Sequence, residues 1–208
     1  MYRELKRMGL AANIKRDFIF MKRLLRILKW VKPVNPDSHD LVCDDFEAVA
    51  TKWPNNLAVK FEGKSLTYQQ LDTMANRLAH WGRQRGLKPG DTVALFLPNR
   101  LDYLAIWLGF NKIGVITALI NNSLTGAGLA HCINISVASL TIVDQTTRAA
   151  FQEIESQIER HQALWVLDLP RESETENCRS LDAALKGVSS VRPDRAFRSG
   201  LTAHNIAL

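Results

Sequence analysis

Short apolar runs alternate with amphipathic segments through the middle of the chain. Thr92–Leu97 is an apolar run rich in β-forming residues, and Val115–Ile120 is a second, partly β-branched run. Between them, apolar residues recur at roughly helical spacing, and Gly114 follows where a helix commonly ends in a left-handed residue. We therefore predict a strand–helix–strand unit with two buried strands and a right-handed crossover. The inward positions of this helix are predicted to be Leu101, Leu104, Ala105, Leu108 and Ile113.

The same alternation continues towards the C-terminus. Apolar runs at Leu140–Val143 and Leu164–Leu167 predict two more buried strands, and helical patterns cover Leu129–Ile135 and Thr146–His161. Strands that alternate with helices are typical of an α/β fold, so we predict a doubly wound, mainly parallel sheet with flanking helices. Pro170–Cys178 is polar and is predicted to be a loop.

The segment before the first core strand carries clear local signals. Two short β-type runs, Leu57–Phe61 and Ser65–Thr67, flank Glu62-Gly63-Lys64, which predicts a hairpin. Thr67 is followed three residues later by Gln70, and this capping box predicts the start of a long helix.

Positive charge is concentrated at the N-terminus. The chain has a net charge of +6, and residues 1–32 hold ten Lys and Arg against two Asp and Glu, a net +8. The remaining residues therefore carry a net −2, so an anionic partner would bind this arm and not the body. Nucleic acid is disfavoured as a partner, because the body has no excess of basic residues.

The basic arm is also amphipathic. Apolar residues recur at spacings of three and four from Ile14 to Leu28, and no apolar run approaches the roughly 20 residues of a bilayer span. A helix lying in the interface of an anionic membrane, on its inner, cytoplasmic face, fits this pattern. The alternative, an ordinary helix that packs its apolar side onto the body, stays open. The residues predicted to meet the membrane are Lys22, Arg23, Arg26, Lys29 and Trp30, with Trp30 as an interface anchor.

Proline and small polar residues separate the arm from the body. Pro33 and Pro36 lie in a short polar stretch that disfavours regular structure. We therefore predict an amphipathic helix over residues 1–32, a linker over 33–40 and a partial α/β domain over 41–208.

A series of motifs in the body resembles a known family. Their order and spacing resemble the early part of the AMP-forming acyl-CoA synthetases, or adenylate-forming ligases, and most closely the very-long-chain fatty acyl-CoA synthetase and fatty acid transport protein branch. The resemblance implies ATP-dependent activation of a fatty acid through an acyl-adenylate, linked to fatty acid uptake, with ATP, Mg and coenzyme A as cofactors. The motifs are Leu66–Leu71 (LTYQQL), Lys88–Leu95 (KPGDTVAL), Pro98–Arg100 (PNR), Trp107–Gly114 (WLGFNKIG), Ala118–Asn121 (ALIN) and His131–Asn134 (HCIN).

The chemistry that the family needs is not found in this sequence. No Ser/Thr/Gly-rich loop ending in lysine occurs, and Gly126-Ala127-Gly128 is interpreted as the start of a helix. The family's later adenine, magnesium, ribose and lysine motifs are also missing. We therefore assign no catalytic, cofactor-binding or metal residue. The chain is expected to be an incomplete, inactive N-terminal part of a ligase large domain that binds none of these cofactors by itself.

Two other function classes remain as alternatives. The first is a non-catalytic membrane-docking or interaction module, for which the basic arm is the supporting feature. The second is a small nucleotide-binding α/β protein, which the lack of a phosphate-cradling glycine loop disfavours.

The remaining candidate sites favour structural roles. His131-Cys132 lies in a predicted helix with no third metal ligand nearby, so we interpret the pair as packed beside the sheet. Asp144 follows the third strand at an edge where α/β folds bind ligands, but we expect it to cap the next helix. Asn99 and Arg100 follow the first strand, where a turn is favoured over ligand contact. Three widely spaced cysteines fit reduced thiols in the cytoplasm.

Overall fold

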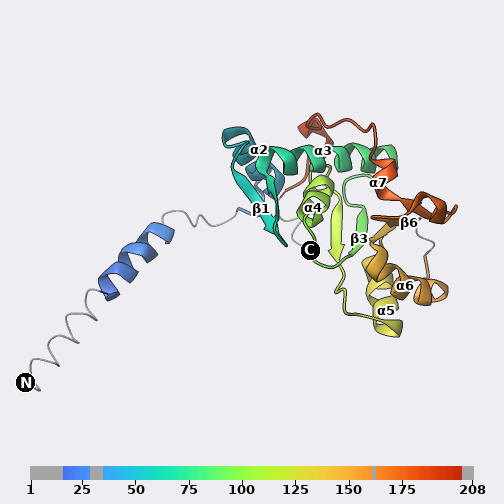
Figure 1. Cartoon of the computed structure of the whole chain (residues 1–208). Helices are drawn as coiled ribbons and strands as arrows, with labels where there is room; N and C mark the ends of the chain where they lie inside the picture. The colour runs from blue at the N-terminus through green and yellow to red at the C-terminus, as the bar shows by residue number, and fades with distance from the viewer. Residues whose placement is uncertain (1–15, 29–34, 161–162, 203–208) are drawn as a thin grey trace, which may run out of the picture. The chain divides into compact units, whose positions relative to one another are not determined.

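The computed structural model describes residues 16–28, 35–160 and 163–202 (Figure 1). They fall into two units, one up to Pro36 and one from Asp37 on, and each is described separately. The first unit contains a helix over residues 16–28. The second unit contains the sheet and the other helices.

Five parallel strands form the main sheet, in the order β4-β3-β5-β6-β7. Strand β3 is an inner strand whose residues Val93–Leu95 pair on both sides, as Val93 does with Thr117 of β4 and Leu140 of β5. The chain runs from β3 to β4 on one side and then crosses to β5 on the other, which confirms the predicted doubly wound topology. The strands are β3 (Thr92–Phe96), β4 (Ile116–Leu119), β5 (Leu140–Val143), β6 (Ala163–Val166) and β7 (Cys178–Ser180).

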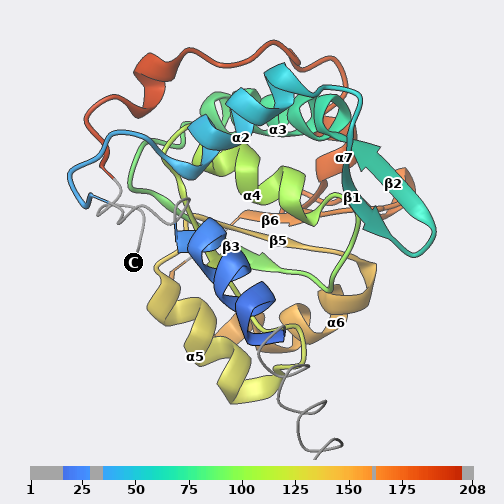
Figure 2. The same cartoon turned by 90° about the vertical axis from the view of Figure 1, so that its left-hand side faces the viewer.

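Helices cover both faces of the sheet (Figure 2). One core layer contains Val93 and Leu95 of β3, and the other contains Ala94 and Phe96, as the twofold alternation of a strand requires. The first layer lies under α3 (Tyr68–Gln84), α4 (Tyr103–Asn111) and α7 (Leu181–Ala184), and the second lies against α5 (Gly126–Ser136) and α6 (Gln145–Ile154). A further helix, α2 (Val42–Lys52), packs on α3 and α4.

Local sequence signals explain the hairpin and the start of the long helix that precede the sheet. Strands β1 (Leu57–Phe61) and β2 (Lys64–Thr67) pair antiparallel around Glu62 and Gly63, whose φ angles of 47° and 78° give the two left-handed residues of a tight hairpin turn. The Thr67 hydroxyl accepts from the Gln70 N–H at 3.2 Å, and the Gln70 side chain accepts from the Thr67 N–H at 2.9 Å. The predicted hairpin and capping box are therefore confirmed.

Helices α3 and α4 approach each other at a glycine. A Cβ atom on Gly109 would lie 2.6 Å from the Leu78 Cβ and 2.8 Å from the Ala75 carbonyl oxygen, so only glycine allows this contact. Beside it, the buried Trp81 packs edge-on against Trp165 of β6, with ring centroids 4.8 Å apart. This close packing fixes α3 and α4 over the sheet.

Several sequence-based expectations about these elements were wrong. Strand β4, predicted to be buried, is an edge strand with β3 as its partner, and its Leu119 is 57% exposed. Leu104 of α4, predicted to face inward, is 42% exposed. Strand β7 begins at Cys178, at the end of the predicted loop, and was missed because three residues give no measurable periodicity.

The helix predicted to reach His161 is shorter in the structure. Helix α6 ends at Ile154, and the chain tightens into the 3₁₀ turn η1 (Glu155–Gln157). Two further 3₁₀ turns, η2 (Arg171–Ser173) and η3 (Arg195–Arg198), occur in the segments around β7 and near the C-terminus.

Candidate functional site

The strand order reverses between β3 and β5. Parallel α/β sheets bind ligands in the crevice outside the carboxyl ends of their strands at such a reversal. Here the chain leaves β3 through Pro98-Asn99-Arg100 and leaves β5 through Asp144. This edge of the sheet is therefore the candidate ligand-binding region.

Arg100 occupies this edge with three carboxylates around it. Its guanidinium lies 2.7 Å from Asp102, 2.9 Å from Asp168, which follows β6, and 3.4 Å from Asp144. The Arg100 side chain is 20% exposed, whereas that of Asp168 is 64% exposed. The cluster thus connects the segments that follow β3, β5 and β6.

The protonation states of this cluster follow from its contacts. Burial tends to lower the pKa of Arg100, but hydrogen bonds and charge from Asp102 and Asp168 outweigh it and raise that pKa. Burial tends to raise the pKa of Asp144, but hydrogen bonds from Thr146 and Thr147 outweigh it and hold that pKa below its ordinary value. Arg100 is therefore a fixed cation and Asp144 a fixed anion at neutral pH.

Asp144 has the structural role expected from the sequence. One of its carboxylate oxygens accepts from the backbone N–H groups of Thr146 and Thr147, at 2.9 and 3.1 Å, and so caps α6. The predicted turn is also present, since the Tyr103 N–H donates to the Arg100 carbonyl. The ion pairs of Arg100 were not foreseen, because its partners lie 2, 44 and 68 residues further along the chain.

The charge balance of this edge disfavours phosphate binding. One guanidinium faces three carboxylates, so the cluster has a net negative charge and repels an anion. Gly126, with φ of 52°, begins α5, which confirms that Gly126-Ala127-Gly128 starts a helix. Among the described residues, no group of three His, Cys, Asp or Glu side chains is placed to hold a metal ion.

His131 and Cys132 lie on α5, as predicted. Cys132 is half-buried against the core layer of α5 and α6, and His131 is exposed. The structure therefore confirms that the pair lies on a helix and that Cys132 packs beside the sheet, but the expectation that His131 also packs there was wrong.

A second charged cluster is buried between α2, α3, α4 and the C-terminal segment. Lys112, which is fully buried, forms ion pairs with Glu47 and, at 2.8 Å, with Asp72. Arg198 lies 2.9 Å from Glu47 and donates to the Lys112 carbonyl, and Arg192 lies 2.8 Å from Asp72. Because its cations are already paired with acids, we assign this cluster to structure and not to ligand binding.

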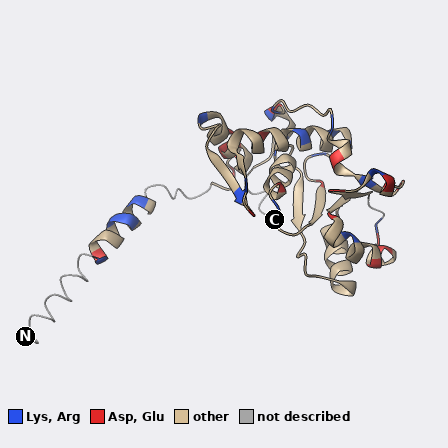
Figure 3. Ribbon diagram, in the orientation of Figure 1, with Lys and Arg blue, Asp and Glu red and all other residues tan. Residues whose placement is uncertain are grey.

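The predicted membrane-interface residues fall partly within the structure. Lys22, Arg23 and Arg26 lie exposed on the helix over residues 16–28, where Figure 3 shows the basic positions. Lys29 and Trp30 lie outside the described residues. None of the helices in the described part of the chain is long and apolar enough to cross a membrane. The membrane contact itself stays a prediction.

Comparison with known proteins adds to this geometry. Mouse long-chain fatty acid transport protein 1 is 35% identical over 146 residues, which cover 69% of this chain and 22% of that protein. The chain therefore spans about a fifth of the length of this relative.

Solved structures share the fold at low sequence identity. An anthranilate CoA ligase, AuaEII, in complex with anthranoyl-AMP superposes with a TM-score of 0.65 at 18% identity, covering 71% of this chain and 28% of the ligase. A Mycobacterium tuberculosis fatty acyl CoA synthetase superposes with a TM-score of 0.61 at 22% identity, covering 71% and 28%. The family described as AMP-binding enzyme matches residues 46–197, which include the whole parallel sheet, and the chain therefore belongs to the AMP-binding enzyme family.

Proposed function

We propose that this chain forms the N-terminal part of a long-chain fatty acid–CoA ligase. The family match over residues 46–197 carries the proposal, because it runs through the sheet and its flanking helices. The likeness to a protein named for long-chain fatty acid transport supports a fatty acid as the acyl substrate, linked to its uptake.

The proposed reaction has two steps. The fatty acid carboxylate attacks the α-phosphorus of ATP and pyrophosphate leaves; the thiol of coenzyme A then attacks the acyl carbonyl and AMP leaves. Both steps need cations and backbone donors that stabilise developing negative charge. Because the described residues offer no metal-holding group, we assign no step to Mg in this chain.

We infer that the 208-residue chain alone acts as a scaffold and does not turn over substrate. Arg100, the cation at the reversal of strand order, already faces three carboxylates, and the glycines at the start of α5 have no lysine partner. We therefore expect no palmitate-dependent release of AMP from the chain alone. Robust turnover would refute the scaffold proposal.

A segment exchange tests the parent activity. Residues 46–197 would replace the matching segment of a relative that itself releases AMP from ATP with palmitate and coenzyme A, and the 35% identical mouse protein is the first to assay. We expect the exchanged protein to keep palmitate-dependent AMP release. A folded exchange protein with no such activity would argue against the proposed function.

We further propose that the helix over residues 16–28 binds an anionic membrane surface. Phe18, Leu25 and Leu28 are 70%, 62% and 56% exposed, and exposed basic residues lie on the same helix. Exposed apolar side chains beside cations suit the boundary between acyl chains and anionic headgroups. This arrangement would place the protein on the cytoplasmic face of a membrane.

Vesicle sedimentation tests this second proposal. We expect the full chain to bind phosphatidylserine-containing vesicles, to lose binding as salt is raised, and to lose it when Lys22, Arg23 and Arg26 are changed to glutamine. The matched control changes Lys52, Lys60 and Lys64, which are exposed on the body, to glutamine. If the helix instead packs its apolar side onto the body, deleting residues 1–32 will lower the stability of the body and leave vesicle binding unchanged.

A further inference from the structure

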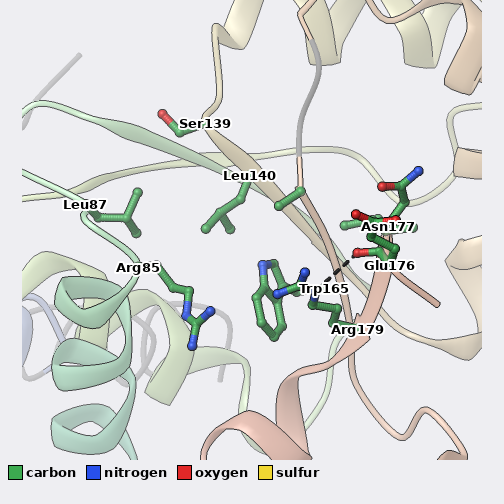
Figure 4. A pocket seen from close by; sticks show the side chains of 10 residues that line it. Arg85, Leu87, Ser139, Leu140, Trp165, Glu176, Asn177 and Arg179 are labelled. Atoms are coloured by element: carbon green, nitrogen blue, oxygen red, sulfur yellow. Dashed lines mark hydrogen bonds between the residues drawn. The ribbon is translucent and has the colours of Figure 1, made fainter. Parts of the chain in front are cut away.

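A cavity of about 340 Å³ opens at the amino ends of β5 and β6, opposite the edge that holds Arg100 (Figure 4). Leu140 and Ala163, the first residues of these two strands, line it. This volume lies in the range of small-molecule sites in proteins. Nothing in the proposed ligase function uses this end of the sheet.

The floor of the cavity is apolar and rigid. Leu87, Leu140 and Leu164 are buried and line it, together with the indole of Trp165. Trp165 is fixed from behind by the edge-on contact with Trp81. Trp165 is 4% exposed, so an apolar group would contact only the small accessible part of the indole together with the leucines, on a surface that is already formed.

Two arginines line the same cavity as this indole. They are Arg85, from the end of α3, and Arg179, from β7, and both are drawn with Trp165 in Figure 4. The Arg85 guanidinium lies 5.3 Å from the centroid of the Trp165 ring, and the Arg179 Nε donates to the Glu176 carbonyl at 3.1 Å. Both arginines thus converge on the cavity from different elements.

Among the described residues, no carboxylate lies within ion-pair distance of Arg85 or Arg179. Within the described ranges, Arg100, Arg192, Arg195 and Arg198 all form ion pairs, whereas Arg85 and Arg179 form none. Glu176 also lines the cavity, which leaves the lining residues with a net charge of +1. A carboxylate ligand would supply the negative charge that the two guanidinium groups lack, through the paired N–H···O hydrogen bonds that arginine forms with carboxylates.

We propose that this cavity binds a small organic carboxylate with a flat apolar body. The apolar body lies on the leucines and Trp165, and the carboxylate contacts Arg85 and Arg179. This site is separate from the ligase proposal, so either can fail without the other.

Calorimetric titration of the full 208-residue chain tests the site with a matched pair of probes. The probes are 2-naphthoate and its uncharged analogue 2-naphthamide, which have nearly the same shape. We expect naphthoate to bind at least about tenfold more tightly, because charge-assisted hydrogen bonds are stronger than neutral ones. Equal affinity for both probes, or no heat with either, would overturn the proposal.

Variants locate the binding to this cavity. Arg85→Gln and Arg179→Gln should each weaken naphthoate binding by about tenfold and leave the weak naphthamide binding nearly unchanged. Arg171→Gln is the matched control, since Arg171 is exposed and does not line the cavity. All three changes are at exposed positions, and thermal unfolding would verify that the fold is kept. Naphthoate binding that is unaffected by both cavity variants would place the probe elsewhere and refute the assignment.

Discussion

Replacing the buried Lys112 by methionine tests directly whether the charged cluster that Lys112 forms with Glu47 and Asp72 stabilises the body. The Lys112 side chain is 0% exposed, and the side chains of its partners Glu47 and Asp72 are 11% and 13% exposed. Methionine keeps the length and apolar stem of the side chain but removes its charge. The substitution therefore leaves two nearly buried carboxylates without their shared cation.

The expected loss can be scaled from the remaining contacts. Breaking a buried ion pair by removing one partner costs about 3–5 kcal/mol. Glu47 keeps Arg198 at 2.9 Å and Asp72 keeps Arg192 at 2.8 Å, so we expect the lower end, about 3 kcal/mol. With a urea dependence of about 2 kcal/mol per molar for a domain of this size, the unfolding midpoint should fall by about 1.5 M.

Urea unfolding followed by circular dichroism measures this shift. Lys64→Met is the matched control, because Lys64 is exposed in the hairpin, and should move the free energy of unfolding by less than about 0.5 kcal/mol. The double variant Lys112→Met/Asp72→Asn should lose less than the sum of the single losses, because both changes remove the same contact. A Lys112→Met midpoint equal to that of the control would refute the claim that the cluster stabilises the body.

Three further predictions concern acidity, packing and thiol reactivity. Burial tends to raise the pKa of Asp72, but the hydrogen bonds from Lys112 and Arg192 outweigh it and lower that pKa. The stabilisation that ionised Asp72 provides should therefore be complete above about pH 4 and be lost as the pH falls further. Asp72→Asn should reduce the fall of the urea unfolding midpoint with pH in this acidic range. Gly109→Ala should destabilise the body by about 1–3 kcal/mol, because the new methyl group collides with α3, and an unchanged melting temperature would contradict the close helix contact. Burial raises the pKa of Cys43 to about 11, so in the native chain Cys43 should react with Ellman's reagent far more slowly than the half-buried Cys132, and equal rates would contradict the structure.

Much of the fold could be predicted from the sequence because its signals are local. The hairpin before α3 is set by a two-residue turn that includes Gly63, and the start of α3 by Thr67 and Gln70, three residues apart. Strand β5 coincides with its predicted limits because it is a short apolar run buried on both faces. The family resemblance, which rests on motif order, is confirmed by the match to AMP-binding enzymes.

The errors arise where position in the sheet decides burial. Strand β4 has the apolar composition of an inner strand, but topology places it at an edge, where Leu119 is exposed. The ion cluster of Arg100 and the cluster of Lys112 were not predicted, because their partners are distant in sequence and charged residues are usually solvated. The sequence signal for the second cluster is that Lys112 stands within an apolar helix-to-strand connection, because an ammonium group buried there needs an acidic partner.

The chain order of the Lys112 cluster has a consequence for synthesis on the ribosome. Asp72 emerges 120 residues before Arg192, and Glu47 emerges 151 residues before Arg198. During elongation Glu47 and Asp72 therefore share the single ammonium group of Lys112, and the nascent body stays acidic on this side until Arg192 and Arg198 are released. Contacts between such distant residues form late and slowly, so these ion pairs would form only after strands β3 to β7 are made.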